Sequence, residues 1–209
     1  MLGLPKSTEL SKQLPKKAIY LKFNMNTAAK DKFDADISRI TIVSEISPST
    51  TTIAKGEEIS AIYVLLVSLK HKNYNEATIA QLNKLINQSM VLVLECGAER
   101  RLAVYQTRLI QGEWMPADNC TLTLKGLNLD DVWNNIVVQI GSIDVEKGNS
   151  LEEQIAVDEK RAKVLKEIER LDALARKEKQ PKKKFELVQK INAMRNSEFG
   201  IRNGGSDEE

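Results

Sequence analysis

Residues 59–69, ISAIYVLLVSL, are the stretch that decides the fold of this chain. The apolar residues run almost without interruption from Ile62 to Val67, and the stretch contains no glycine or proline. A short apolar run of this kind predicts a central strand that is covered on both faces of a sheet. It is far too short to cross a bilayer, which takes about 20 apolar residues.

Further strands and helices are predicted on both sides of this strand. Toward the C-terminus we expect a helix over about 76–87 capped by Asn75, strands over 90–95 and 101–107 joined as a hairpin, shorter strands over 109–114 and 121–124, and a helix over about 128–140. Toward the N-terminus we expect a strand over 40–46, a helix over about 27–36 capped by Asn26 or Thr27, a strand over 19–23 and a short helix over 7–14. Several strands are adjacent in sequence, so the order predicts an α+β fold with a mixed or mainly antiparallel sheet flanked by helices.

The sequence changes character near Gly148. Residues 150–195 are highly charged, contain no glycine and carry apolar residues at helical spacing. Ser150 and Glu153 form a capping-box pattern, and Pro181 suits the first turn of a second helix. We therefore expect an α+β domain over 1–148, a charged helical hairpin over 150–196 and a disordered tail over 197–209.

The apolar stripe of this hairpin is a candidate surface for a protein partner. Val157, Val164 and Leu171 are seven residues apart, and Ile168 widens the stripe. Two heptads are too few for an autonomous coiled coil, so the stripe must pack on the second helix, on the globular domain or on another protein. Trp114, in an expected loop, is a further candidate: it either anchors an interface or caps one end of the core.

Residues 176–184, RKEKQPKKK, are the sharpest charge cluster, with six basic residues in nine. Such a cluster at the turn of a hairpin can contact phosphates, although a solvated turn is the plainer interpretation. The chain's net charge is only +2, so any contact with nucleic acid must come from a local patch. The candidate residues are Arg176, Lys177, Lys179, Lys182, Lys183 and Lys184.

The composition excludes several kinds of catalytic and metal-binding site. His71 is the only histidine, which excludes metal sites built on a pair of histidines. The glycines are isolated, so neither a phosphate-binding loop nor a dinucleotide fingerprint is present. Two cysteines, Cys96 and Cys120, are too few for a disulfide scaffold or a cysteine-rich zinc site. We expect no metal, no cofactor and no membrane segment, and a reduced, cytoplasmic chain.

The remaining enzyme hypothesis is metal-dependent cleavage of nucleic acid by carboxylates and a lysine on a sheet. The available residues are Glu58, Glu95, Glu99 and Lys70. The pattern fails in detail, because no carboxylate stands two positions before Lys70 and two arginines follow Glu99. Surface charges at strand ends are the plainer interpretation, and a catalytic role is only an alternative.

Four segments carry a resemblance to a known family. They are DISRITI (36–42), IYVLLVSLK (62–70), MVLVLE (90–95) with LAVY (102–105), and GLNLD (126–130). Over about residues 15–145 the chain resembles the uncharacterised bacterial family called domain of unknown function 4391, in which a helical arm is a common appendage. These motifs are strand patterns and not catalytic signatures, so the family supplies no active site.

The resemblance implies a genomic context beside DNA methyltransferases and helicases of restriction-like defence islands. Together with the hairpin, it leads us to expect a non-catalytic accessory or adaptor subunit that binds such a partner in phage defence. The alternatives are a metal-dependent nuclease with a degenerate site and a stand-alone nucleic-acid-binding protein. Oligomeric state and the choice between DNA and RNA stay open.

Overall fold

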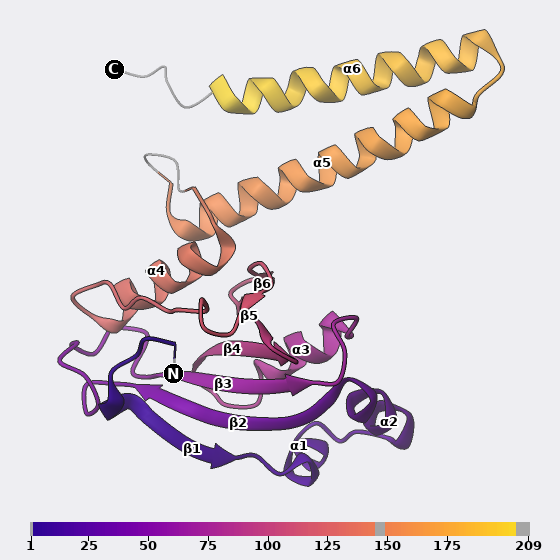
Figure 1. Cartoon of the computed structure of the whole chain (residues 1–209). Helices are drawn as coiled ribbons and strands as arrows, with labels where there is room; N and C mark the ends of the chain where they lie inside the picture. Colours follow the sequence, from indigo (N-terminus) through magenta and orange to yellow (C-terminus); the bar gives the residue numbers. More distant parts are fainter. Residues whose placement is uncertain (1, 145–148, 204–209) are drawn as a thin grey trace, which may run out of the picture. The chain divides into compact units, whose positions relative to one another are not determined.

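The structure, a computed structural model, describes residues 2–144 and 149–203 (Figure 1). The chain divides into two compact units, one that ends at Asp144 and one that begins at residue 145. The first unit contains the sheet, and the second contains two long helices.

One mixed sheet of seven strands organises the described part of the first unit. The strands are β1 (Glu9–Gln13), β2 (Ile37–Ile46), β3 (Ile62–Leu69), β4 (Ser89–Cys96), β5 (Glu99–Tyr105), β6 (Leu109–Gln111) and β7 (Met115–Pro116). Their order is β1-β2-β3-β4-β5-β6, and β7 pairs with β5. β3 and β4 are parallel, whereas the β1–β2, β2–β3, β4–β5 and β5–β6 pairs are antiparallel. The predicted α+β class with a mixed sheet is confirmed.

The helical elements of the first unit are the 3₁₀ turn η1 (Lys6–Thr8) and the helices α1 (Lys16–Lys22), α2 (Thr27–Asp36), α3 (Glu76–Leu82) and α4 (Leu129–Gly141). Three of these helices, α2, α3 and α4, begin at asparagine caps, whereas α1 follows Pro15. The side chains of Asn26, Asn75 and Asn128 accept a backbone N–H in the first turns of α2, α3 and α4. Each cap satisfies a donor that a helix start would otherwise leave without a partner.

β3 is the buried centre that its sequence predicts. Val64 and Leu65 are adjacent, so they point to opposite faces of the sheet, and both are fully buried. Leu65 belongs to a core cluster with apolar side chains of α1, α2 and α3, among them Ile19, Phe33 and Ile79. The other covering helix, α4, packs against β5 and β6. A strand covered on both faces needs apolar residues at consecutive positions, as residues 62–67 supply.

Two of the expected elements near the N-terminus were wrong, whereas the helix over 27–36 and the strand over 40–46 are present as α2 and within β2. Residues 9–13 form the edge strand β1, which pairs with β2, instead of the short helix expected over 7–14. All five of its residues are exposed, so backbone pairing and not side-chain burial stabilises this strand. Residues 16–22 form the helix α1 instead of the strand expected over 19–23. Ile19 is buried while Leu21 is 70% exposed, a difference that alternation alone does not anticipate.

Three differences occur further along the chain. α3 ends at Leu82, earlier than expected, and the N–H groups of Asn83 and Lys84 bond to carbonyls three residues back, a tight turn that closes a helix. The expected strand over 121–124 does not form. The backbone of these residues forms hydrogen bonds instead with the Leu2 carbonyl and with the side chain of Gln139. β7 was not expected from sequence.

The second unit is the predicted helical hairpin. α5 (Leu151–Lys177) and α6 (Pro181–Asn203) lie side by side and antiparallel (Figure 1). The capping box is present: the Glu153 N–H donates to Ser150 Oγ over 3.3 Å, and the Ser150 N–H donates to the Glu153 carboxylate over 2.8 Å. α6 continues through Asn203, so 197–203 are helical where a tail was expected, and 204–209 lie outside the described residues. Within the described ranges, no helix has the length and apolar character needed to span a bilayer.

Candidate functional site

The two helices of the hairpin bury part of the expected partner-binding stripe between themselves. Ile168 and Leu171 of α5 form a cluster with Ile191 of α6, and Val164, Leu187 and Met194 pack around it. Packing on the second helix was one of the alternatives that the sequence left open for this stripe. Ile168 and Leu171 are almost fully buried there and do not form an exposed surface. Val157, the fourth residue of the stripe, is half-buried.

Other apolar side chains of the hairpin are exposed. Phe185 is 62% exposed and Val188 is 40% exposed. The face of α6 that packs on α5 is formed by Leu187, Ile191 and Met194, at the i, i+4, i+7 spacing of one helical stripe. At 3.6 residues per turn, Phe185 lies nearly opposite this stripe on α6, and Val188 lies at the side of it. Leu174 of α5 is 44% exposed.

A groove of about 580 Å³ lies at the turn of the hairpin. Its lining consists of Leu174, Lys177, Glu178, Lys183, Glu186, Leu187 and Lys190. Two leucines thus lie among charged side chains that are mostly basic. Sequence analysis identified the charge of this segment but not the groove, because the groove depends on how the two helices meet.

The candidate phosphate-contacting residues gather around this turn. All six of them are exposed. Arg176 forms an ion pair with Asp172 on its own helix, with 2.8 Å between Nη2 and Oδ2. In the described part of the chain, Lys177, Lys179, Lys182, Lys183 and Lys184 form no ion pair with a carboxylate. Their positive charge is therefore available to an external anion.

Three of the four candidate nuclease residues lie at one end of the sheet. Lys70, Glu95 and Glu99 follow or flank the carboxyl ends of the parallel strands β3 and β4. Glu58 precedes β3 and lies near its opposite end, where its N–H donates to the Asp130 carboxylate. The eight residues of β3 span about 26 Å, at about 3.3 Å per residue. The structure does not bring Glu58 together with the other three.

The two remaining glutamates are neutralised by cations of the protein. Glu95 accepts from the Nε and Nη2 atoms of Arg100, over 2.9 and 2.7 Å. Glu99 forms an ion pair with Lys72. Within residues 2–144 and 149–203, no group of three or more histidine, cysteine, aspartate or glutamate side chains is placed to hold a metal ion. Glu95 and Glu99 therefore form ion pairs with Arg100 and Lys72 at one end of the sheet.

Trp114 lies at the same end of the sheet as these ion pairs. It packs, half-buried, against the core cluster. The Lys72 Nζ atom lies 5.2 Å from the centroid of its ring, and the Arg101 guanidinium carbon lies 5.7 Å away, both within range of cation–π attraction. Arg101 also donates to the Gly112 carbonyl over 2.6 Å. This packing fits the second of the two roles considered for Trp114, and its role as an interface anchor stays a prediction.

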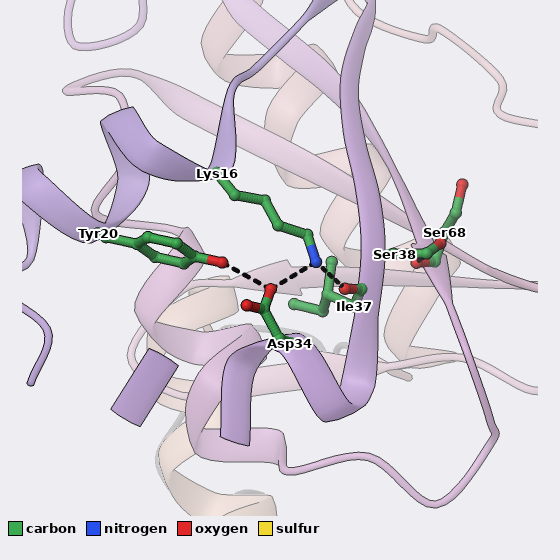
Figure 2. Close-up of polar contacts among 6 residues, drawn as sticks. All are labelled: Lys16, Tyr20, Asp34, Ile37, Ser38 and Ser68. Atoms are coloured by element: carbon green, nitrogen blue, oxygen red, sulfur yellow. Dashed lines mark hydrogen bonds and ion pairs between the residues drawn. The ribbon is translucent and has the colours of Figure 1, made fainter. Parts of the chain in front are cut away.

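A polar network that sequence analysis missed connects α1, α2 and the start of β2 (Figure 2). Lys16 Nζ donates to Asp34 Oδ1 over 2.6 Å and to the Ile37 carbonyl over 2.5 Å. The Tyr20 hydroxyl donates to the same Asp34 oxygen over 2.6 Å. The hydrogen bonds from Lys16 and Tyr20 lower the pKa of Asp34, while burial and the Asp34 charge raise the pKa of Tyr20 to about 12. No local signal reveals this network, because its members are 14 to 21 residues apart.

This network predicts a pH-dependent contribution to stability. The lowered pKa of Asp34 means that its contribution is complete above the ordinary value of 3.8 and is lost as the pH falls through the folded-state value. The Tyr20 contribution is complete below pH 10 and is lost as the pH rises toward 12. We expect the difference in free energy of unfolding between the wild type and Asp34→Asn to be constant from pH 5 to 8 and to shrink at lower pH.

Urea unfolding at a series of pH values measures this difference. Asp31→Asn is the matched control, because Asp31 is an exposed aspartate on the same helix. Its difference from the wild type should be small at every pH. A difference for Asp34→Asn that stays the same from pH 5 down to pH 2 would contradict the structural role of the network.

Comparison with known proteins identifies the family but not an activity. The profile of the family described as a domain of unknown function (DUF4391) matches residues 2–197. The chain belongs to this family. No curated protein and no solved structure matches the chain. The DUF4391 match extends past the range of about 15–145 judged from the sequence and includes most of the hairpin.

Proposed function

We propose that this DUF4391 protein is a non-catalytic accessory subunit that binds a DNA-processing protein through the tip of its helical hairpin. The observation that carries the proposal is the exposure of Phe185 at 62% beside an exposed Val188, on a helix that already buries a different apolar face. Aromatic side chains, phenylalanine included, are enriched in protein interfaces relative to the rest of the surface.

The type of partner follows from the resemblance and not from the geometry. Neighbouring genes for DNA methyltransferases and helicases, which the resemblance implies, make an enzyme of one of these two classes the proposed partner. The proposal therefore includes a cytoplasmic location and a role in a phage-defence or restriction-like system. The family match includes most of the hairpin, which supports the proposal that members of the family use this unit for the same purpose.

Contact with nucleic acid is a second candidate function. It is favoured by the exposed lysines of the turn, which form no ion pair in the described part of the chain. If nucleic acid co-purifies with the protein, contacts between these lysines and its phosphates would explain the binding. The nuclease alternative receives less support, because Glu58 is far from Glu95 and Glu99, and both of these are paired with cations.

The proposal is tested by affinity purification of the full-length protein, tagged and expressed at native level in its own cells. We expect a methyltransferase or helicase to co-elute in stoichiometric amount, and we expect this co-elution to persist after nuclease treatment. Phe185→Glu should reduce that yield at least tenfold, because it places a charge where the interface is expected to exclude water. Since Phe185 is largely exposed, the substitution should leave the hairpin folded.

Leu165→Glu is the matched control for this experiment. Leu165 is 45% exposed on α5 and lies 12 residues before Lys177, about 18 Å along the helix. The Leu165→Glu substitution also replaces an apolar side chain with an acidic one, but at a position away from the turn. The yield of the co-eluting partner should equal that of the wild type. Unchanged co-elution with Phe185→Glu, or the loss of the partner on nuclease treatment, would refute the proposal.

A further inference from the structure

The groove at the turn of the hairpin combines two chemical properties. Its apolar lining, here called the floor, consists of Leu174, which is 44% exposed, and Leu187, which also packs against the hairpin core. Its rim contains Lys177, Lys183 and Lys190 together with two glutamates. Apolar floors with charged rims are the usual form of grooves that accept an amphipathic helix.

The surroundings of the groove are strongly basic. Residues 176–190 contain seven basic and two acidic side chains. Lys177 and Lys183, on the rim, form no ion pair in the described residues, so their charges have no internal partner. A ligand that complements this surface must carry several negative charges as well as apolar groups.

We infer that the occupant of this groove is an acidic amphipathic helix of a protein partner. The inference rests on the proposed function, since it specifies the chemistry of the segment that the accessory subunit binds. The α6 part of the lining, from Lys183 to Lys190, is eight residues long, about 12 Å or two helical turns. A partner helix with leucines at i, i+3 and i+7 covers the same length, and its apolar side chains lie against Leu174 and Leu187. Its aspartates and glutamates pair with the lysines of the rim.

The leucine floor favours this occupant over two others. A nucleic-acid backbone would pair with the lysines but has no apolar side chain to bury against Leu174. A second copy of the chain would bring an equally basic turn to the groove, and like charges at an interface disfavour association. An acidic helix uses both the floor and the rim.

A direct binding measurement with the full-length protein tests this inference. The probe is a fluorescein-labelled 18-residue peptide with leucines at helical spacing and aspartate and glutamate elsewhere. The control peptide has the same composition, with the leucines redistributed around the helix. We expect the amphipathic peptide to bind at least tenfold more tightly by fluorescence anisotropy, and binding to weaken as salt is raised.

Two substitutions locate the binding in the groove. Leu174→Glu and Lys183→Glu should each weaken binding of the amphipathic peptide at least tenfold, one through the floor and the other through the rim. Lys160→Glu makes the same charge change at an exposed position of α5 outside the groove and should weaken binding less than twofold. Circular dichroism of each variant verifies that the helices are intact.

The outcomes separate this inference from the proposed function. Equal binding of the two peptides, or binding unaffected by both groove variants, overturns the inference. So does a labelled 20-base-pair DNA duplex that binds in a Lys183-dependent manner while the amphipathic peptide does not. If the inference fails in one of these ways while Phe185→Glu still removes the co-eluting enzyme, the proposed function stands and the partner uses a different part of the tip.

Discussion

Replacing Gly126 with alanine should lower the free energy of unfolding by about 2–4 kcal/mol, the combined cost of a strained backbone and a close contact. Gly126 has a φ of +146°, which residues with a Cβ atom rarely adopt. A Cβ atom there would lie 2.6 Å from the Cβ of Asp131 and 2.7 Å from the backbone nitrogen of Val132. These atoms belong to the first turn of α4, so the backbone must shift and the cap of this helix is disturbed.

Gly97→Ala is the matched control for Gly126→Ala. Gly97 also has a positive φ, +62°, but a Cβ atom there meets nothing within 4 Å. A left-handed conformation of this kind costs an alanine only about 1 kcal/mol. Urea or thermal unfolding of both variants measures the contrast. Equal losses would mean that the crowding at the start of α4 is not a constraint on the fold.

The second large effect is expected in the hairpin. Leu171→Asp places a carboxylate at a position that is 3% exposed, in the small cluster between α5 and α6. Loss of leucine burial and desolvation of the charge together cost at least about 3 kcal/mol. Isolated helices are marginal in water, so the loss of this packing should unfold the hairpin. Hydrogen exchange should show protection lost over residues 151–195, together with reduced helical circular dichroism.

Strands β3 and β4 provide a reference in the same hydrogen-exchange sample, because they have their own buried core. Leu165→Asp is the matched substitution, since Leu165 is 45% exposed on the same helix. It should leave protection of the hairpin nearly unchanged. If Leu171→Asp also leaves protection unchanged, the two helices do not depend on this cluster for their stability.

Elements with short-range signals could be predicted from the sequence. Asn26, Asn75 and Asn128 mark helix starts because each side chain bonds to a backbone N–H two or three residues away. The capping box at Ser150 and the break before Pro181 depend on neighbouring residues only. Such signals act over a few residues and need no knowledge of the rest of the fold.

The elements that were mispredicted depend on partners far along the chain. The β1 sequence, ELSKQ, has no apolar alternation, and it is a strand because β2 offers a free edge for backbone hydrogen bonds. Residue propensity and apolar alternation carry no information about an edge strand whose paired residues are 28 to 35 positions away in sequence.

The candidate site shows the same division. The sequence identified the basic turn, because charge clustering is visible in the order of residues alone. The order of residues does not show how far the charged side chains lie from one another or from the apolar side chains. The separation of Glu58 from Glu95, the ion pair between Glu95 and Arg100, and the outward position of Phe185 all depend on strand order or helix packing.

The sequence by itself determined the central strand, the capped helices, the hairpin and its basic turn, because each is encoded by the period of apolar residues or by caps within one helical turn. Only the tertiary structure decided the edge strand β1, the network around Asp34 and the groove between Leu174 and Leu187. These features arise where segments distant in sequence meet, and the geometry of such contacts is set by how the whole unit packs.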